Sequence, residues 1–208
     1  MGNILNMGYK LNHMVDLSLL DDGVVIDGGS AKGEFLTAFR KLNNQCTVYC
    51  FECNATNLKS LIDLKDQNMY FFREALVGEG SPKIVKFTEF KGVDGKYYQW
   101  GNIYGNHKDN SDNMKLEEIV EYMVPTTTLR EVIEKTNINI ISYLKLDIEG
   151  AEEEIFNTLS PDVIDKIKQF SVEYHSESAR KAIYDSMSAL FDLIEDKVNH
   201  EIYGRKKV

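Results

Sequence analysis

The sequence predicts an α/β fold with a doubly wound, mostly parallel sheet, and three segments carry this prediction. Residues 24–42 and 140–156 each run from a mostly apolar stretch, through a turn with glycine and acids, into a predicted helix. Residues 47–52 form a further strand-like run directly after the helix of the first unit, as in a βαβ crossover. Such crossovers join neighbouring parallel strands, so these runs are expected in one sheet.

Composition and charge limit the classes of function. The 208 residues, 43% of them hydrophobic, suit a single domain over residues 1–208. With 33 acidic against 24 basic residues, no nucleic-acid partner is expected, because binding a phosphate backbone requires a basic face. No apolar run reaches about 18 residues and no secretory signal is visible, so we predict no membrane association and a cytoplasmic location. Cys46, Cys50 and Cys53 fit buried thiols better than a metal or redox site, since no second pair accompanies them.

The turn of the first unit is the most informative segment. Residues 1–22 precede it, and their apolar residues predict a short helical cover over one edge of the core. In the turn, Asp27 is followed by glycines at positions 28, 29 and 33. A dinucleotide-binding turn requires G-x-G-x-x-G, whereas this spacing resembles the D-x-G-x-x-x-G turn of class I S-adenosylmethionine-dependent methyltransferases. An acid suits that cofactor, because S-adenosylmethionine carries an ammonium and no phosphate. The alternative is that the glycine turn binds no ligand and only packs the helix on the strand.

A second acid, Glu52, ends the next strand, 25 residues after Asp27. Neighbouring parallel strands bring both carboxylates to one edge, where βαβ nucleoside sites place the acid that binds ribose hydroxyls. We therefore predict ribose binding for Glu52, with an ordinary surface acid as the alternative. Asn54 is predicted to cap the following helix, and Thr128 with Glu131 fits a capping box at the start of a later one.

Residues 69–72 predict the third strand, and the loop after it holds Glu74 and Ala75. This loop is expected beside the adenine of a ligand that lies on the first two strands. Ordinary turn polarity explains the loop equally well.

An insertion is predicted between residues 83 and 125. Residues 83–90 and 119–124 half alternate, which predicts an antiparallel hairpin. Residues 91–118 are polar, contain scattered aromatic residues and have no regular period. Long irregular loops are usually functional, so we predict a lid or acceptor-binding insertion, with simple packing of the rings as the alternative.

The second unit supplies the candidate catalytic residues. Its strand delivers Asp147 and Glu149 to a carboxyl end, where open α/β sheets bind ligands, and acids 152–154 fit a solvated first helical turn. His175, which ends the last parallel strand, is the most attractive general base because its ordinary pKa lies near neutrality. Asp147 and Glu149 are rival bases or acceptor clamps, and a supporting role is the alternative for His175. These acids with Glu173 could gather a cation, but no metal site is predicted, since carboxylates converge in many sites without one.

The end of the chain predicts an incomplete sheet edge. Residues 176–196 read as one last helix, and residues 198–208 suffice for one strand. The sheet is therefore expected to have a shortened C-terminal edge, and an exposed edge favours a homodimer.

Several motifs, in this order, are similar to those of the FkbM family of methyltransferases. The resemblance covers roughly residues 22–176. Two positions depart from the family pattern: Cys53 stands where a proline is usual, and Gly28 stands where an apolar residue is usual. The matching segments are 25–33 (VIDGGSAKG), 51–54 (FECN), 127–129 (TTL), 144–152 (LKLDIEGAE) and 171–175 (SVEYH).

The resemblance implies a Rossmann-like sheet of the class I methyltransferase type, S-adenosylmethionine as methyl donor, and commonly a hydroxyl of a glycan or secondary metabolite as acceptor. By position, Asp27, Gly29 and Gly33 would hold the methionine part, Glu52 the ribose, and Asp147 would lie near the methyl group. The residues predicted to contact the cofactor are Asp27, Gly28, Gly29, Ser30, Gly33, Glu52, Cys53, Glu74, Ala75 and Asp147.

Two other functions stay open at this point. One is a nucleoside-binding module that lacks catalysis, and the other is a nucleotide-dependent oxidoreductase, which the glycine spacing disfavours.

Overall fold

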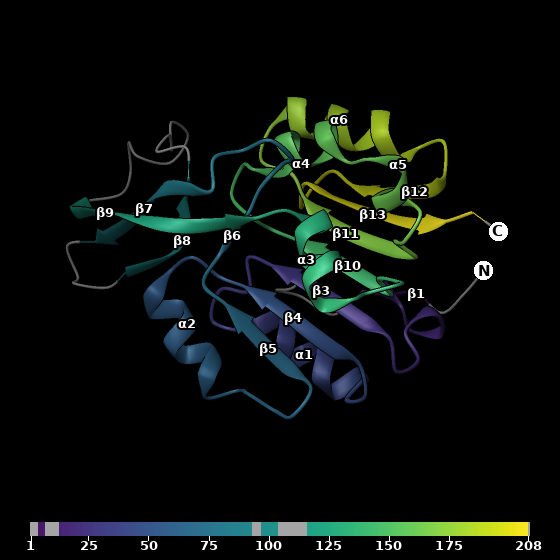
Figure 1. Cartoon of the computed structure of the whole chain (residues 1–208), viewed down its shortest axis with the longest axis horizontal. Coiled ribbons are helices and arrows are strands. Elements are labelled where there is room, and N and C mark those ends of the chain that lie inside the picture. Colours follow the sequence, from purple (N-terminus) through teal and green to yellow (C-terminus); the bar gives the residue numbers. More distant parts are fainter. Residues whose placement is uncertain (1–3, 7–12, 93–96, 104–115, 208) are drawn as a thin grey trace.

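A seven-stranded sheet forms the centre of the molecule (Figure 1). The computed structural model describes residues 4–6, 13–92, 97–103 and 116–207. The strand order is β12-β13-β11-β10-β3-β4-β5, and every strand is parallel to its fellows except β13. The predicted mostly parallel α/β sheet is therefore confirmed. The strands are β3 (Val24–Gly28), β4 (Thr47–Phe51), β5 (Met69–Phe72), β10 (Tyr143–Leu146), β11 (Gln169–Glu173), β12 (Phe191–Asp196) and β13 (Glu201–Lys206).

Helices cover both faces of this sheet, as a doubly wound fold requires. Side chains alternate along each strand, so Val25 packs under one helical layer and Ile26 under the other. The first layer contains α1 (Glu34–Leu42) and α2 (Ala55–Ile62). The second contains α3 (Leu129–Thr136), α4 (Glu152–Thr158), α5 (Pro161–Ile164) and α6 (Glu177–Met187). None of the described helices has both the length and the apolar character needed to cross a bilayer.

Two predicted helix caps are confirmed. The Asn54 side chain accepts a hydrogen bond of 2.9 Å from the backbone N–H of Asn57 at the start of α2. Thr128 and Glu131 form the reciprocal capping box at the start of α3. Both caps fix the point at which the chain leaves a strand edge and enters a helix.

The predicted N-terminal helix is wrong. Residues Met14–Asp16 form strand β2, paired with β1 (Ile4–Asn6), and only a short 3₁₀ turn, η1 (Leu17–Leu19), follows. The Gln169 amide bonds both the N–H and the C=O of Asp16, at 2.8 and 3.0 Å, and Glu201 accepts from the N–H of Met14. These partners lie more than 150 residues away in sequence, so they hold the segment extended in a way that local periodicity does not reveal.

The predicted shortened C-terminal edge is also wrong. Helix α6 ends at Met187, and residues Phe191–Asp196 form β12, antiparallel to β13, so the sheet has seven strands. The Asp196 side chain accepts from the N–H groups of Val198 and Asn199, at 3.0 and 3.2 Å, and so reverses the chain between the two strands. The strand that we expected to be missing from this edge is therefore present, and the expectation of a homodimer loses the incomplete edge on which it was based.

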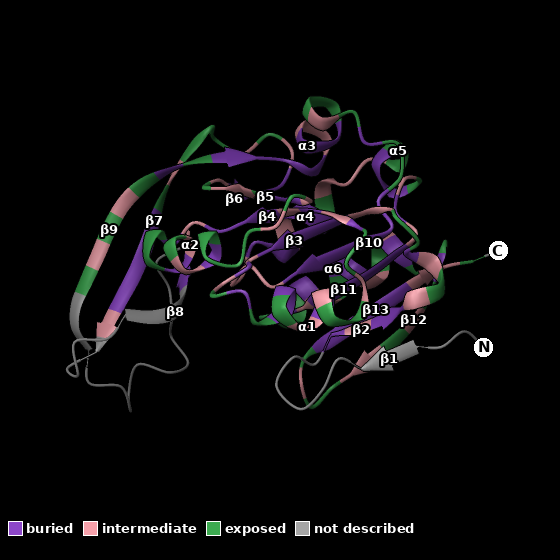
Figure 2. Cartoon of the chain, turned by 90° about the horizontal axis from the view of Figure 1, so that it is seen from below, coloured by how far each residue is buried: buried purple, intermediate pink, exposed green. Residues whose placement is uncertain are grey.

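A second, smaller sheet is inserted after β5 and projects from the body at the left of Figure 1. The predicted hairpin is confirmed, since β7 and β9 pair antiparallel from Ile84↔Pro125 to Gly92↔Leu116. Part of the predicted irregular segment 91–118 instead forms β8, while residues 93–96 and 104–115 lie outside the described part of the chain. Figure 2 shows exposed residues along the outer part of β9, in contrast to the buried central sheet. The strands are β6 (Ala75–Leu76), β7 (Ile84–Gly92), β8 (Tyr97–Asn102) and β9 (Leu116–Thr127).

Candidate active site

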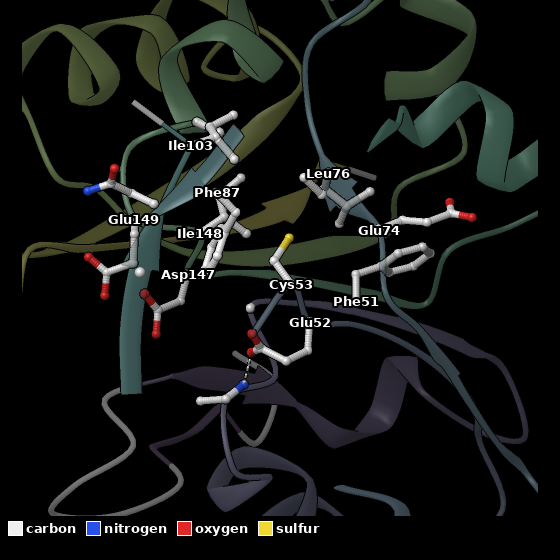
Figure 3. Close-up of a pocket in the computed structure, with 16 residues that line it drawn as sticks. Phe51, Glu52, Cys53, Glu74, Leu76, Phe87, Ile103, Asp147, Ile148 and Glu149 are labelled. Carbon is white, nitrogen blue, oxygen red and sulfur yellow. Dashed lines mark hydrogen bonds between the residues drawn. The ribbon is translucent and has the colours of Figure 1, made fainter. Parts of the chain in front are cut away.

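A pocket of about 210 Å³ lies where the carboxyl ends of β3, β4 and β10 meet the inserted sheet (Figure 3). Phe87 and Ile103 from the insertion, and Phe51 and Ile148 from the main sheet and the loop after β10, give the pocket its apolar surface. This is the edge at which open α/β sheets bind ligands. The predicted site residues that line it are Gly29, Glu52, Cys53, Glu74, Ala75, Asp147 and Glu149.

The charged side chains that line the pocket are all acidic. They are the carboxyl groups of Glu52, Glu74, Asp147 and Glu149, and no Lys or Arg is among the lining residues that the structure describes. Such a pocket attracts a cationic ligand and repels a pyrophosphate. The charge of the lining therefore disfavours a ligand that contains a pyrophosphate, as the glycine spacing also does.

The glycine turn reaches the pocket through Gly29. Its φ is +74°, and a Cβ at this position would lie 1.7 Å from the carbonyl oxygen of Asp147. The N–H of Gly29 donates to the carbonyl oxygen of Phe51 at 2.9 Å, and the N–H of Asp147 donates to that of Gly28 at 3.0 Å. The turn is therefore clamped between β4 and the end of β10, and only glycine fits there.

The carboxylate of Glu52 lies under this turn. It accepts hydrogen bonds of 2.7 Å from the backbone N–H groups of Ala31 and Asn54 (Figure 3 shows the first). Burial raises its pKa from 4.5 to about 7, although the two hydrogen bonds oppose the shift. Glu52 thus links the glycine turn to the start of α2 and presents a carboxyl group that titrates near neutral pH.

Asp27 does not reach the pocket. Its side chain is fully buried, and the Lys145 ammonium lies 3.2 Å from its Oδ1. The same ammonium donates to the carbonyl oxygens of Gly29 at 2.7 Å and Gly28 at 3.3 Å. Burial lowers the pKa of Lys145, but the charges of Asp27 and Asp147 outweigh it and raise that pKa above its usual value. Asp27 therefore influences the turn indirectly, by pairing with the Lys145 ammonium that binds the carbonyl oxygens of Gly28 and Gly29.

Sequence reasoning missed Lys145, although a signal was present. A lysine inside the apolar run Leu144–Leu146 has no place in a buried strand unless an acid faces it. In the sheet, Lys145 and Asp27 are direct cross-strand partners on β10 and β3. The pair was open to prediction from these two strands alone.

Three further predicted residues shape the turn without lining the pocket. A Cβ on Gly28 would lie 2.8 Å from the side chains of Leu146 and Leu76. The hydroxyl of Ser30 is buried and donates to the carbonyl oxygen of Asp27 at 3.1 Å. Gly33 has a φ of +83° and packs α1 closely against the end of α2. These residues allow the turn to be tight.

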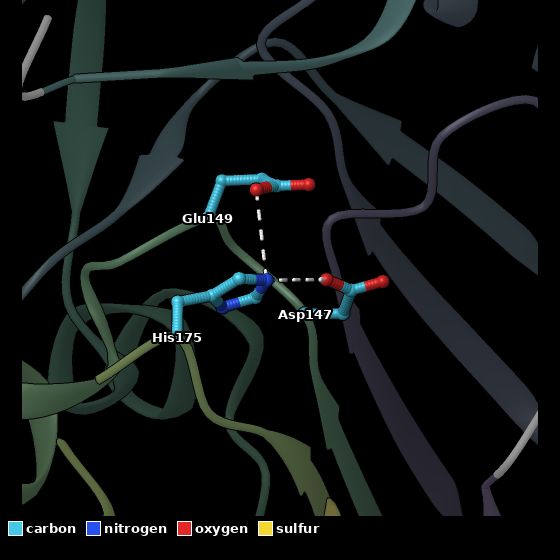
Figure 4. Close-up of side chains that lie close together, drawn as sticks. All are labelled: Asp147, Glu149 and His175. Atoms are coloured by element: carbon cyan, nitrogen blue, oxygen red, sulfur yellow. Dashed lines mark ion pairs between the residues drawn. The ribbon is translucent and has the colours of Figure 1, made fainter. Parts of the chain in front are cut away.

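His175 lies beside Asp147 and Glu149 (Figure 4). Its Nε2 is 3.8 Å from an oxygen of Asp147 and 3.5 Å from one of Glu149, and its Nδ1 hydrogen-bonds Glu152 at 3.1 Å. Burial lowers the pKa of His175, but the hydrogen bond and the surrounding carboxylates outweigh burial and raise it to about 10. The imidazole is therefore protonated at neutral pH in the free protein, which does not fit the predicted role as general base.

Glu152 is not part of a solvated first turn, contrary to the expectation for residues 152–154. Its carboxylate is fully buried and accepts from the N–H groups of Ile148 and Gly150, at 3.1 and 3.0 Å, as well as facing His175. It therefore fixes both the loop that carries Glu149 and the histidine ring. Sequence spacing alone did not separate it from Glu153 and Glu154, which are half-buried.

Glu149 has the more suitable environment for proton transfer. Burial raises its pKa to about 7, with the charge of His175 opposing the shift and that of Asp147 adding to it. The residue adopts a positive φ of 57° and is followed by Gly150, so the loop turns its side chain toward the pocket and the histidine. The geometry brings together a carboxyl group with a near-neutral pKa and the pocket.

Comparisons with known proteins agree with this arrangement. A family model described as the methyltransferase FkbM domain matches residues 27–200. The structure of an FkbM methyltransferase from Methylobacillus flagellatus KT aligns with a TM-score of 0.51 and 14% identity, over 88% of this chain and 44% of that one. The chain thus spans less than half the length of that methyltransferase.

Other comparisons are weaker. A putative caffeoyl-CoA O-methyltransferase from Staphylococcus aureus aligns with a TM-score of 0.48 and 8% identity, over 89% of this chain and 76% of that one. No protein with a curated function matches the chain. The family model, however, covers most of the sequence, from the glycine turn to the last hairpin. The chain therefore belongs to the FkbM family of methyltransferases.

Proposed function

We propose that the chain binds S-adenosylmethionine in the pocket and transfers its methyl group to a hydroxyl oxygen of a small-molecule or glycan acceptor. The observation that carries the proposal is the all-acidic set of charged groups beside the Gly29 turn. S-adenosylmethionine carries a sulfonium and an ammonium but no phosphate, so an acidic pocket favours it over a dinucleotide. The oxidoreductase alternative loses support for the same reason.

Each pocket residue has a role that follows from its position. Glu52 would accept the ribose hydroxyls with the lone pairs of its carboxylate oxygens that the N–H groups of Ala31 and Asn54 leave free. The loop with Glu74 and Ala75 would face the adenine, and Gly29 would let the methionine part lie against the backbone. Asp27 would contribute indirectly, because Lys145 separates it from the pocket.

The cofactor would supply an electrophilic methyl group, and the protein would align the acceptor and take up its proton. Alignment supplies most of the rate in such a displacement, because both reactants are held at short range. The proton would pass to a carboxylate near the pocket, for which Asp147 and Glu149 are the candidates, since His175 already holds a proton at neutral pH. The inserted sheet, through Phe87, Asn102 and Ile103, would form the acceptor-facing wall.

Calorimetric titration with S-adenosylhomocysteine tests the proposal. Wild-type protein is expected to bind one equivalent, and Glu52→Ala is expected to weaken binding by about tenfold or more, since it removes hydrogen bonds to a charged group. Glu134→Gln, an exposed substitution on α3, serves as the control and should bind as wild type. Absence of heat with folded wild-type protein, together with a fluorescence change on adding NADH, would instead support an oxidoreductase.

A module that binds the cofactor without catalysis is the remaining alternative. It predicts normal S-adenosylhomocysteine binding but no methylated product in a broad screen of glycans and hydroxylated metabolites with radiolabelled donor. A labelled product that disappears in Asp147→Ala excludes it.

A further inference from the structure

The side chains of Asp147, Glu149 and His175 form a compact cluster at one end of the pocket, which we call the carboxylate–histidine cluster (Figure 4). The first two residues follow β10 and the third follows β11, so loops after two neighbouring strands bring them together. One ligand atom from each lies within 4.8 Å of the others. Their side chains are 30%, 25% and 26% exposed, so the cluster is reachable from solvent.

The orientation of His175 is fixed from behind. Its Nδ1 is hydrogen-bonded to the fully buried carboxylate of Glu152, which is itself held by the N–H groups of Ile148 and Gly150. Metal-binding histidines commonly use one ring nitrogen for such a carboxylate, which sets the ring so that the other nitrogen faces the ion. His175 therefore already has, on Nδ1, the carboxylate partner that metal-binding histidines commonly have.

The front nitrogen of the ring, Nε2, makes no hydrogen bond within the described part of the chain. Carboxylate oxygens of Glu149 and Asp147 nevertheless lie 3.5 and 3.8 Å from it, too far for good hydrogen bonds. Ligands held about 2.1 Å from one cation lie about 3.0–3.4 Å apart, depending on the geometry. The three ligand atoms, which lie within 4.8 Å of one another, would therefore move closer together by up to about 1–2 Å on binding a cation, which side-chain rotation can supply.

The charge around the cluster is unbalanced. Besides the two acidic ligands, Glu152 and Glu173 also face the imidazole, the latter at 4.0 Å. Lys145 lies 3.9 Å from Asp147, but it is closer to Asp27, which it neutralises. Four carboxylates thus share one imidazole, and a divalent cation would offset the excess negative charge.

We propose that Asp147, Glu149 and His175 bind a divalent cation of the manganese type. Two carboxylates favour a cation with a preference for oxygen, and Mn²⁺ also accepts an imidazole nitrogen in place of the proton there. Asp147 and Glu149 also line the pocket, so the remaining coordination positions lie toward it. Its use in catalysis would be to hold the acceptor oxygen and so make its proton easier to transfer to the uncoordinated oxygen of one of these two carboxylates; this use rests on the proposed function.

Titration of Mn²⁺ followed by electron paramagnetic resonance tests the site without any other ligand. Wild-type protein is expected to remove the free Mn²⁺ signal with a stoichiometry of one ion per chain. Asp147→Asn and His175→Gln, which keep the side-chain shape, are expected to lose at least about tenfold in affinity. Glu134→Gln makes the same charge change on the exposed surface of α3 and should bind as wild type.

Thermal unfolding provides a check that the variants fold. A Mn²⁺ concentration that raises the Tm of wild-type protein by about 5 °C should raise the Tm of the two ligand variants by clearly less. The proposal is overturned if wild-type protein binds no Mn²⁺ at millimolar concentration, or if both folded ligand variants bind it within threefold of wild type. Calorimetry with S-adenosylhomocysteine in EDTA is read separately, so failure of the cation site and failure of cofactor binding are distinguishable.

Discussion

Glu52→Gln tests the energetic consequence of burying a carboxyl group under the glycine turn. Burial, opposed by hydrogen bonds from Asn54 and Ala31, raises the pKa of Glu52 from 4.5 to about 7. Because the folded-state pKa lies above the unfolded-state value, the stability that Glu52 contributes is full below the unfolded pKa and is lost as pH rises through the folded one. Between about pH 5 and pH 8, this shift lowers the free energy of unfolding by about 2.5 kcal/mol.

Urea unfolding of wild-type protein and Glu52→Gln at the two pH values measures this term. The amide has one oxygen for two N–H donors, and the resulting cost is similar at both pH values, so it cancels from the comparison. Other titrating groups are common to both proteins and also cancel. The midpoint of wild-type unfolding should fall by about 1 M more urea than that of the variant. Equal losses in the two proteins would refute the assigned burial effect.

Two further substitutions test the clamp behind the pocket. Lys145→Met leaves the buried Asp27 carboxylate without its cation and should lower the free energy of unfolding in urea by about 3–5 kcal/mol. Adding Asp27→Asn should recover most of this loss. If the double variant is no more stable than Lys145→Met alone, the pairing argument is wrong. Gly29→Ala should unfold at lower urea and bind S-adenosylhomocysteine at least about tenfold more weakly, because its Cβ overlaps the carbonyl oxygen of Asp147. Gly80→Ala is the matched control, because Gly80 has a φ of +90° but open space where the Cβ would lie, and it should lower the free energy of unfolding by only about 1 kcal/mol. An equal loss at both glycines would show that backbone strain, and not the overlap with Asp147, determines the residue at the turn.

The central strands and caps were predictable because their signals are local. The glycine turn, the apolar runs that precede Asp27 and Asp147, and the caps at Asn54 and Thr128 each depend on residues within a few positions of one another. The same runs placed Glu52 and Asp147 at one sheet edge, because parallel strands present their carboxyl ends together. Most of the pocket followed from this rule.

The errors occurred where distant partners decide the structure. Residues Met14–Asp16 are extended because Gln169 and Glu201 bind their backbone, and Phe191–Asp196 are a strand because β13 pairs with them. Glu152 and its half-buried neighbours Glu153 and Glu154 have the same residue type, and only the fold shows which one is fully buried. The charge state of His175 likewise depends on the carboxylates gathered around it, not on its own sequence position.

The inserted sheet has its own small core, made from residues such as Ala75, Phe87 and Val124, separate from the two cores of the seven-stranded sheet. A change of length or composition on the outer part of β7 and β9 therefore leaves the packing of the main body untouched. Under the proposed function, substitutions of Phe87 or Ile103 in this sheet would therefore alter the wall that faces the acceptor and leave in place the residues proposed to hold the methyl donor.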